Sequence, residues 1–141
     1  MLFRSLAHIV RAALESVCYQ TRDLVAAMAQ DAVAPIELRV DGGMVVNDWL
    51  TQFLADVLQV PVVRPETVET TALGAAFLAG LQSGVYGSLE EISKLWQMDR
   101  RFKPKLAAAK ADTLYAGWQK AVARVVGAPS GATASAPTGR A

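Results

Sequence analysis

Hydrophobic residues recur at three- and four-residue steps through much of the chain, and this spacing predicts helices. The predicted helices span about residues 5–30, 47–58, 71–82, 88–96 and 112–126. Two short segments depart from this spacing. Residues 36–40 alternate apolar and polar side chains, and residues 60–65 form an apolar run with a proline near each end. Both segments predict strands, because proline is tolerated at strand ends but not within a central strand.

The predicted elements follow the order helix, strand, helix, strand, helix, and then two further helices. Such alternation predicts right-handed crossovers and a parallel pair of strands. A parallel pair covered by helices on both faces normally belongs to a larger sheet. The pattern therefore predicts a piece of an α/β domain.

The end of the chain differs from the rest in composition. Residues 127–141 contain only Gly, Ala, Pro, Ser, Thr and one Arg. Such a segment cannot bury enough apolar surface to offset the entropy lost on ordering. We therefore expect a folded unit over residues 1–126 and a disordered tail over residues 127–141.

Charge and cysteine content narrow the classes of partner. The 141 residues carry a formal net charge of +1, which argues against nucleic acid and against a polybasic membrane contact. The longest apolar runs fall short of the roughly 18 residues of a membrane-spanning helix. Cys18 is a single cysteine, and His8 has no second ligand at metal-binding spacing. We therefore expect a cytoplasmic setting and no metal site within the chain.

One segment carries candidate chemistry, the run from Asp41 through Gly42 and Gly43 to Asn47. It lies between the end of a predicted strand and the start of a helix, where open α/β sheets bind ligands. Glycines let a ligand approach the backbone, and N–H groups at a helix start favour anionic or polar groups. The structural alternative is that Gly42 and Gly43 form a tight turn, Asn47 caps the helix and Asp41 shapes the turn. The run matches neither a P-loop nor the dinucleotide fingerprint.

Four segments together resemble the last part of the glycerol kinases, members of the FGGY family of carbohydrate kinases. They are residues 9–23, 38–43, 71–80 and 115–118. The resemblance extends almost continuously from about residue 8 to residue 126. It implies an α/β fold that is part of an actin-like ATPase (ribonuclease H-like) domain.

The resemblance also implies a ligand. In the family this turn binds ATP or ADP, with Gly43 contacting the nucleotide through its backbone, next to Gly42, and Asn47 contacting the adenosine. The parent reaction transfers a phosphoryl group from ATP to glycerol with Mg²⁺, for which the resemblance places no ligand in this chain. The catalytic Asp, the phosphate-binding loop and the glycerol contacts of the family lie upstream of the matched part. We therefore expect the chain alone to be inactive.

One residue departs from a regulatory feature of enteric relatives. In those kinases a Glu ahead of the Tyr-Ala-Gly-Trp segment helps to bind a glucose-transport regulatory protein through a shared zinc ion. Lys110 stands at that place here. An ammonium group is not a zinc ligand, so we expect no zinc-bridged complex of this kind.

Two hypotheses for the function remain open at this stage. The chain is the nucleotide-binding portion of a glycerol kinase, either as a truncated product or as one piece of a split enzyme that pairs with the missing N-terminal lobe. Alternatively, it is a non-catalytic adenine-nucleotide-binding or assembly module that forms a homo-oligomer through an open sheet edge. A parent kinase for xylulose, ribulose or gluconate is a variant of the first hypothesis, because the substrate contacts lie outside this chain.

Overall fold

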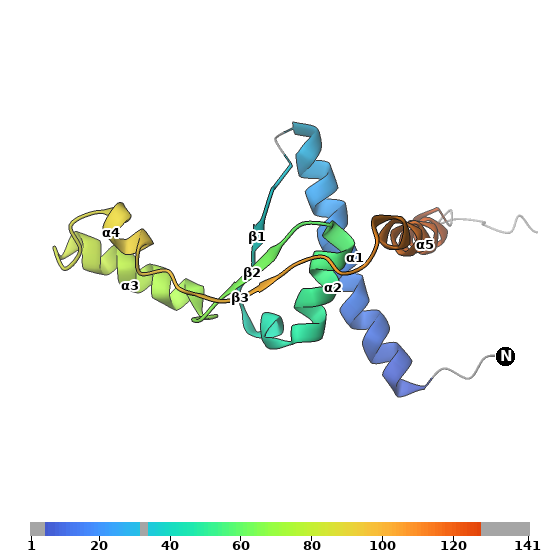
Figure 1. The fold of residues 1–141 in the computed structure, drawn as a ribbon, viewed down its shortest axis with the longest axis horizontal. Helices are drawn as coiled ribbons and strands as arrows, with labels where there is room; N and C mark the ends of the chain where they lie inside the picture. The colour runs from blue at the N-terminus through green and yellow to red at the C-terminus, as the bar shows by residue number, and fades with distance from the viewer. Residues whose placement is uncertain (1–4, 32–33, 128–141) are drawn as a thin grey trace, which may run out of the picture.

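The computed structural model describes residues 5–31 and 34–127 and contains a small mixed sheet with helices at both ends. The elements follow the chain as α1 (Leu6–Asp31), β1 (Leu38–Arg39), η1 (Gly43–Val46), α2 (Asp48–Leu58), β2 (Val62–Pro65), α3 (Thr70–Gln82), α4 (Leu89–Ser93), β3 (Met98–Phe102) and α5 (Ala108–Val126) (Figure 1). The tail expected over residues 127–141 lies outside the described residues, except for Gly127, which is the C-cap of α5.

The sheet has the strand order β1-β2-β3. β1 runs parallel to β2, with Leu38 opposite Val62, and this confirms the predicted parallel pair. β3 runs antiparallel to β2, with Phe102 opposite Val62. The sequence pattern missed β3 because only Phe102 of this strand is buried, so no alternation of apolar and polar residues marks it.

Several predicted boundaries move in the structure. The first strand shortens to Leu38–Arg39. α4 ends at Ser93 rather than at Trp96, because the amides of residues 94–96 donate to carbonyls three residues earlier, as in a 3-10 turn. α5 begins earlier than predicted, at Ala108, since alanine and lysine are strong helix formers.

The first turn of α3 has no side-chain cap. The N-cap residue is Glu69, and its side chain makes no capping hydrogen bond. The Thr70 hydroxyl instead donates to the Asp41 carboxylate, which belongs to the turn after β1. The start of α3 is thus tied to the candidate site rather than capped by its own side chains.

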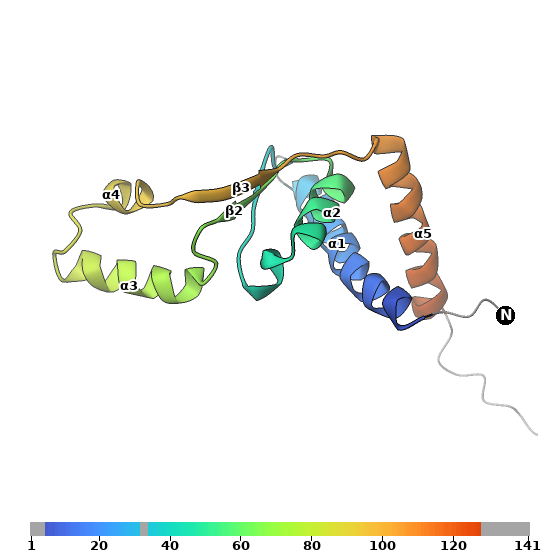
Figure 2. The ribbon, with the colours of Figure 1, turned by 60° about the horizontal axis from the view of Figure 1, so that its bottom comes forward.

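The hydrophobic core lies where α1, α2 and α5 pack together beside the sheet (Figures 1 and 2). Its buried residues are Cys18, Tyr19, Leu50, Phe53, Leu54, Ala55, Val57, Val62 and Phe102. The apolar residues whose spacing predicts a helix over residues 47–58 are therefore largely buried. Trp49 is the exception: it is 41% exposed and stacks on Phe53 with 5.2 Å between ring centroids.

A polar cluster joins α5 to α1. The Asp23 carboxylate accepts hydrogen bonds from the Tyr115 hydroxyl and from Nε1 of Trp118, the latter at 2.7 Å. Arg22 pairs with Asp112 at 2.6 Å and lies over the Tyr115 ring. Burial raises the pKa of Tyr115, and the bond to Asp23 raises it further. The segment around Tyr115 thus fixes the last helix against the first.

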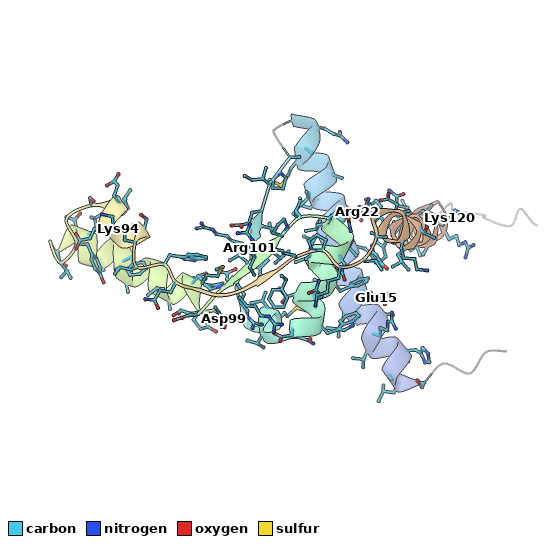
Figure 3. All side chains as sticks on the ribbon, viewed as in Figure 1. Glu15, Arg22, Lys94, Asp99, Arg101 and Lys120 are labelled. Atoms are coloured by element: carbon cyan, nitrogen blue, oxygen red, sulfur yellow. The ribbon has the colours of Figure 1, made fainter. Side chains whose placement is uncertain are left out.

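Charged side chains are spread over the molecule, as Figure 3 shows. The labelled examples lie on four different elements or beside them: Glu15, Arg22, Lys94, Asp99, Arg101 and Lys120. None of the helices in the described ranges is long and apolar enough to cross a membrane.

Candidate functional site

The candidate site is the segment between β1 and α2, which we call the glycine turn (residues 41–47). It lies at the carboxyl end of β1, where the chain also leaves the parallel strand β2. The Val40 amide donates to Val63 at 3.0 Å, and the Gly42 amide donates to Val68 at 2.9 Å. The first bond continues the pairing with β2 beyond the end of β1, and the second joins the loops that follow the two strands. The edge formed by two such loops is where ligands bind in open α/β sheets.

The two glycines of the turn have different roles. Gly42 has φ 90° and ψ 169°, a backbone conformation that is essentially reserved for glycine. Gly43 has no such requirement, and a Cβ atom built on it meets no heavy atom within 4 Å. Gly42 is therefore needed for the path of the chain, whereas the bare backbone of Gly43 leaves open space beside the turn.

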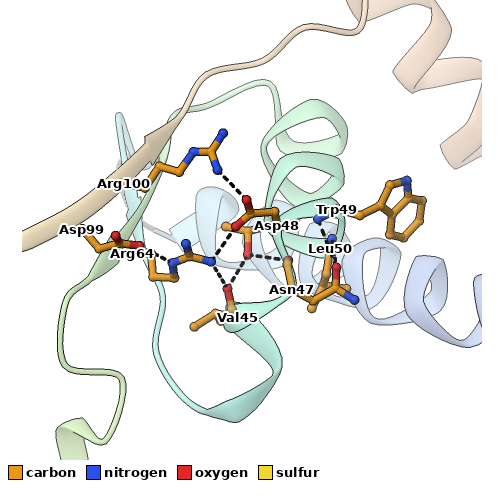
Figure 4. A network of polar contacts seen from close by, with 9 residues as sticks. Val45, Asn47, Asp48, Trp49, Leu50, Arg64, Asp99 and Arg100 are labelled. Carbon is orange, nitrogen blue, oxygen red and sulfur yellow. Dashed lines mark hydrogen bonds and ion pairs between the residues drawn. The ribbon is translucent and has the colours of Figure 1, made fainter.

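Asn47 caps α2. Its Oδ1 accepts hydrogen bonds from the Trp49 and Leu50 amides at 3.0 and 3.3 Å (Figure 4). Asn47 is exposed, and its Nδ2 donates to no residue within the described part of the chain. The capping role considered from the sequence is thus present. It occupies only the oxygen of the amide and leaves the nitrogen free to donate.

The turn also includes a 3-10 helix, η1, which begins at Gly43. Its only buried residue is Val45, whose carbonyl accepts a hydrogen bond from the Thr51 hydroxyl at 3.0 Å. The backbone N–H groups at the start of η1 and the capped N-terminus of α2 lie close along the chain. Helix starts of this kind favour negatively charged or polar ligand groups.

A network of charged residues supports the turn from the sheet side, and the sequence analysis did not find it (Figure 4). Arg64 of β2 donates from Nη1 to the Val45 carbonyl at 2.8 Å and to Asp48 at 2.9 Å. Its Nε donates to Asp99 at 2.7 Å, and Arg100 pairs with the other oxygen of Asp48. The available signal was an arginine placed between Val63 and Pro65 in an otherwise apolar strand.

A glycine turn at the carboxyl edge of parallel strands, followed at once by a helix N-terminus, is the arrangement by which α/β proteins bind nucleotides. Residues 2–83 match the model described as "FGGY family of carbohydrate kinases, C-terminal domain". The chain belongs to the FGGY family of carbohydrate kinases.

Curated relatives agree with this assignment. The chain is 61% identical over 121 residues to a glycerol kinase of Marinomonas sp. (strain MWYL1), covering 86% of this chain and 24% of the relative. It is also 61% identical over 127 residues to a glycerol kinase of Acidovorax sp. (strain JS42), covering 86% of this chain and 26% of the relative. The chain matches their C-terminal portion and spans about a quarter of their length.

Solved structures share the fold. A Plasmodium falciparum glycerol kinase with ADP superposes with a TM-score of 0.74 at 35% identity, over 88% of this chain and 25% of that one. A xylulose kinase from Rhodospirillum rubrum superposes with a TM-score of 0.73 at 26% identity, over 90% of this chain and 26% of that one. The predicted fold, part of an actin-like α/β domain, is confirmed.

Proposed function

We propose that the chain is the C-terminal, nucleotide-binding portion of a glycerol kinase and that its glycine turn holds ATP or ADP. The observation that carries the proposal is the open space at Gly43, beside helix N-termini and the free Nδ2 of Asn47. In this arrangement the Gly43 backbone lies against the nucleotide, next to Gly42, and the Asn47 amide donates to the adenosine. The names of the most similar relatives favour glycerol as the substrate of the parent enzyme.

We propose that this chain contributes to nucleotide binding and not to the chemical step. In phosphoryl transfer most of the catalysis comes from positioning and charge stabilisation around the transferred group. By the family resemblance, the catalytic Asp and the glycerol contacts have no counterpart among these residues. The described residues also hold no group of three or more His, Cys, Asp or Glu side chains that could bind a metal. Mg²⁺ would therefore be held by the nucleotide and by other parts of the kinase.

Activity would then depend on the rest of the kinase, and α1 offers a surface to receive it. A groove of about 480 Å³ along the start of α1 is lined by Leu6, Ala7, Val10, Arg11, Leu14 and Trp49. Leu6 and Val10 are 76% and 52% exposed. Exposed apolar surface of this kind is typical of an interface. We propose the N-terminal lobe of the kinase as the partner and the cytoplasm as the location.

The regulatory prediction concerns a different surface. Lys110 is exposed near the start of α5 and offers an ammonium group where the enteric relatives carry a carboxylate. We propose that the chain forms no zinc-bridged complex through this position. A zinc-dependent complex with the glucose-transport regulatory protein in a pull-down would contradict this.

The nucleotide proposal is tested by titrating the full 141-residue chain with ADP in a calorimeter. We expect the unmutated chain to bind ADP and Gly43→Ala to lose at least about tenfold in ADP affinity, because a methyl group would fill the space needed by the ligand. Gly74→Ala is the matched control, since its Cβ also meets nothing within 4 Å and it lies on α3. Equal ADP affinity of Gly43→Ala and the unmutated chain would refute the proposed nucleotide site.

A second candidate function is a non-catalytic assembly module, and the open edge of the sheet favours it. Among the strands of the described ranges β1 lies at the edge of the sheet, and an edge strand offers its outer side for pairing with another chain. Light scattering coupled to size exclusion distinguishes the candidates. A stable homo-oligomer that does not bind ADP supports assembly, whereas ADP binding without formation of glycerol 3-phosphate supports the kinase portion. Formation of glycerol 3-phosphate by the purified chain would contradict the expected inactivity.

A further inference from the structure

The side chain of Arg64 extends from β2 toward the glycine turn and is only 12% exposed (Figure 4). One nitrogen, Nη1, donates to the Val45 carbonyl at 2.8 Å and to Asp48 Oδ1 at 2.9 Å. Nε donates at 2.7 Å to Asp99, which lies on β3. A single guanidinium, carried by β2, therefore connects β3 to the turn and to the start of α2.

The position of these contacts along the chain is what makes them informative. Val45 lies two residues after Gly43 and two residues before Asn47, and Asp48 is the first residue of α2. Arg64 thus contacts the backbone before Asn47 and the side chain of the residue after it. The Thr51 hydroxyl donates to the same Val45 carbonyl, so this oxygen accepts from two donors.

The charge of Arg64 is stabilised where it lies. Burial acts to lower the pKa of Arg64, but its bonds to Asp99 and Asp48 outweigh burial and raise that pKa. Two of its partners are carboxylates and the third is a carbonyl, and a planar guanidinium can reach all three in one conformation. A lysine has one nitrogen and cannot hold these three partners with the same geometry.

We propose that Arg64 is a positioning residue that holds the glycine turn in its ligand-ready conformation. The proposal rests on the proposed function, because it assigns the purpose of the turn to nucleotide binding. Arg64 acts through Val45 and Asp48 and does not touch the nucleotide. Preorganising a site in this way raises affinity because less order has to be imposed on binding.

The structural alternative is that Arg64 only joins β2 to β3 through Asp99. Two variants separate these roles. Arg64→Gln removes the bonds to the turn and to the neighbouring strand together. Asp99→Asn weakens only the contact between the strands and leaves both Nη1 bonds in place. A positioning role therefore predicts different results for the two variants, whereas a purely structural role predicts similar ones.

The experiment uses the full 141-residue chain, ADP calorimetry and amide NMR spectra, with folding checked by circular dichroism. We expect Arg64→Gln to weaken ADP binding about tenfold, the equivalent of one hydrogen bond to a charged group. We expect shifted signals and faster hydrogen exchange at Gly42, Gly43 and Asn47 in this variant. Asp99→Asn, which keeps both Nη1 bonds, should change ADP affinity and these signals far less than Arg64→Gln, and Arg64→Lys should restore part of the affinity lost in Arg64→Gln.

The remaining outcomes also decide the question. Unchanged turn signals in a folded Arg64→Gln chain, or equal effects of Arg64→Gln and Asp99→Asn, would overturn the proposal. Unfolding of both Arg64→Gln and Arg64→Lys would overturn it too, because Arg64 would then be needed for the fold as a whole. If the unmutated chain binds no ADP, the proposed function fails. Hydrogen exchange at the glycine turn, measured without nucleotide, then still decides whether Arg64 holds the turn.

Discussion

The helices α2 and α3 make an instructive pair, because each follows one of the two parallel strands. α2 buries six of its 11 residues, whereas no residue of α3 is buried among its 13. α2 lies between α1 and the sheet, and α3 lies at the opposite end of the molecule beside α4 (Figures 1 and 2). The same strand-to-helix arrangement thus gives one helix supported by contacts within the chain and one that is largely exposed.

The side chains explain this difference. α2 presents large apolar residues that pack on α1 and β2, and its first turn is capped by Asn47. α3 is rich in alanine and glycine, and Leu78 is 64% exposed. Its aromatic residue Phe77 contacts Tyr86, which lies between α3 and α4. We infer that the α2 region contributes most of the stability of the described fold, while α3 contributes little.

Placing a carboxylate in each helix gives the largest expected contrast. Val57 is fully buried, so Val57→Asp would bury a charge without a partner and destabilise the chain by roughly 4 kcal/mol or more. Leu78→Asp should change the free energy of unfolding by no more than about 0.5 kcal/mol, since this position is exposed. Urea unfolding followed by circular dichroism measures both. Comparable losses in the two variants would show that α3 is supported as well as α2.

The two glycines before α2 provide the next test. Gly42→Ala should cost about 1–3 kcal/mol, because its backbone conformation strains any other residue. Gly43→Ala should leave the free energy of unfolding almost unchanged, since its Cβ enters open space, and should impair only ADP binding. Urea unfolding and ADP titration of both variants check this division. An equally destabilised Gly43→Ala would mean that both glycines serve the fold.

The helix pattern was predictable for α2 because its apolar stripe packs against partners within the same chain. The parallel pair of strands was predictable for a similar reason, since alternating strands and helices allow few topologies. β3 was not predictable, because four of its five residues are exposed and only pairing with β2 makes them a strand.

The candidate site also has parts that the sequence predicts and a part that it does not. The glycine turn has a local sequence signal in Gly42 and Gly43, and the capping role of Asn47 follows from its place before α2. The support from Arg64 depends on residues 16 to 35 positions away, Asp48 and Asp99, so no local pattern reveals it. The sequence therefore locates the glycine turn, and the tertiary structure is needed to find what holds it.

Substitutions at the N-cap residues, Asn47 of α2 and Glu69 of α3, compare the first turns of the two helices. Asn47→Ala should cost about 1 kcal/mol, because two amides of α2 lose their acceptor. Asn47→Asp should keep the cap and lose ADP affinity, since a carboxylate retains the acceptor but not the Nδ2 donor. Glu69→Ala should have no comparable effect on stability, because Glu69 makes no capping bond to α3. Urea unfolding and ADP titration separate the two roles of Asn47. Normal ADP binding by Asn47→Asp would refute the proposed contact between Asn47 and the adenosine.

The smallest expected effect concerns the contact between α1 and α2. Cys18 of α1 is buried and lies 3.7 Å from the Leu50 carbonyl of α2, and burial raises the pKa of its thiol from 9.0 to about 12. Above pH 9 the unfolded chain releases this proton while the folded chain keeps it, so the free energy of unfolding falls with rising pH up to about pH 12. From pH 8 to 9.5 the free energy of unfolding should fall by less than about 1 kcal/mol.

Urea unfolding across this pH range measures the decrease, and Cys18→Ser is the control. The serine hydroxyl does not titrate in this range, so the free energy of unfolding of this variant should depend less on pH. Equal pH slopes of the free energy of unfolding in the two chains would mean that the thiol is not buried between α1 and α2. Water would then reach the contact between these two helices.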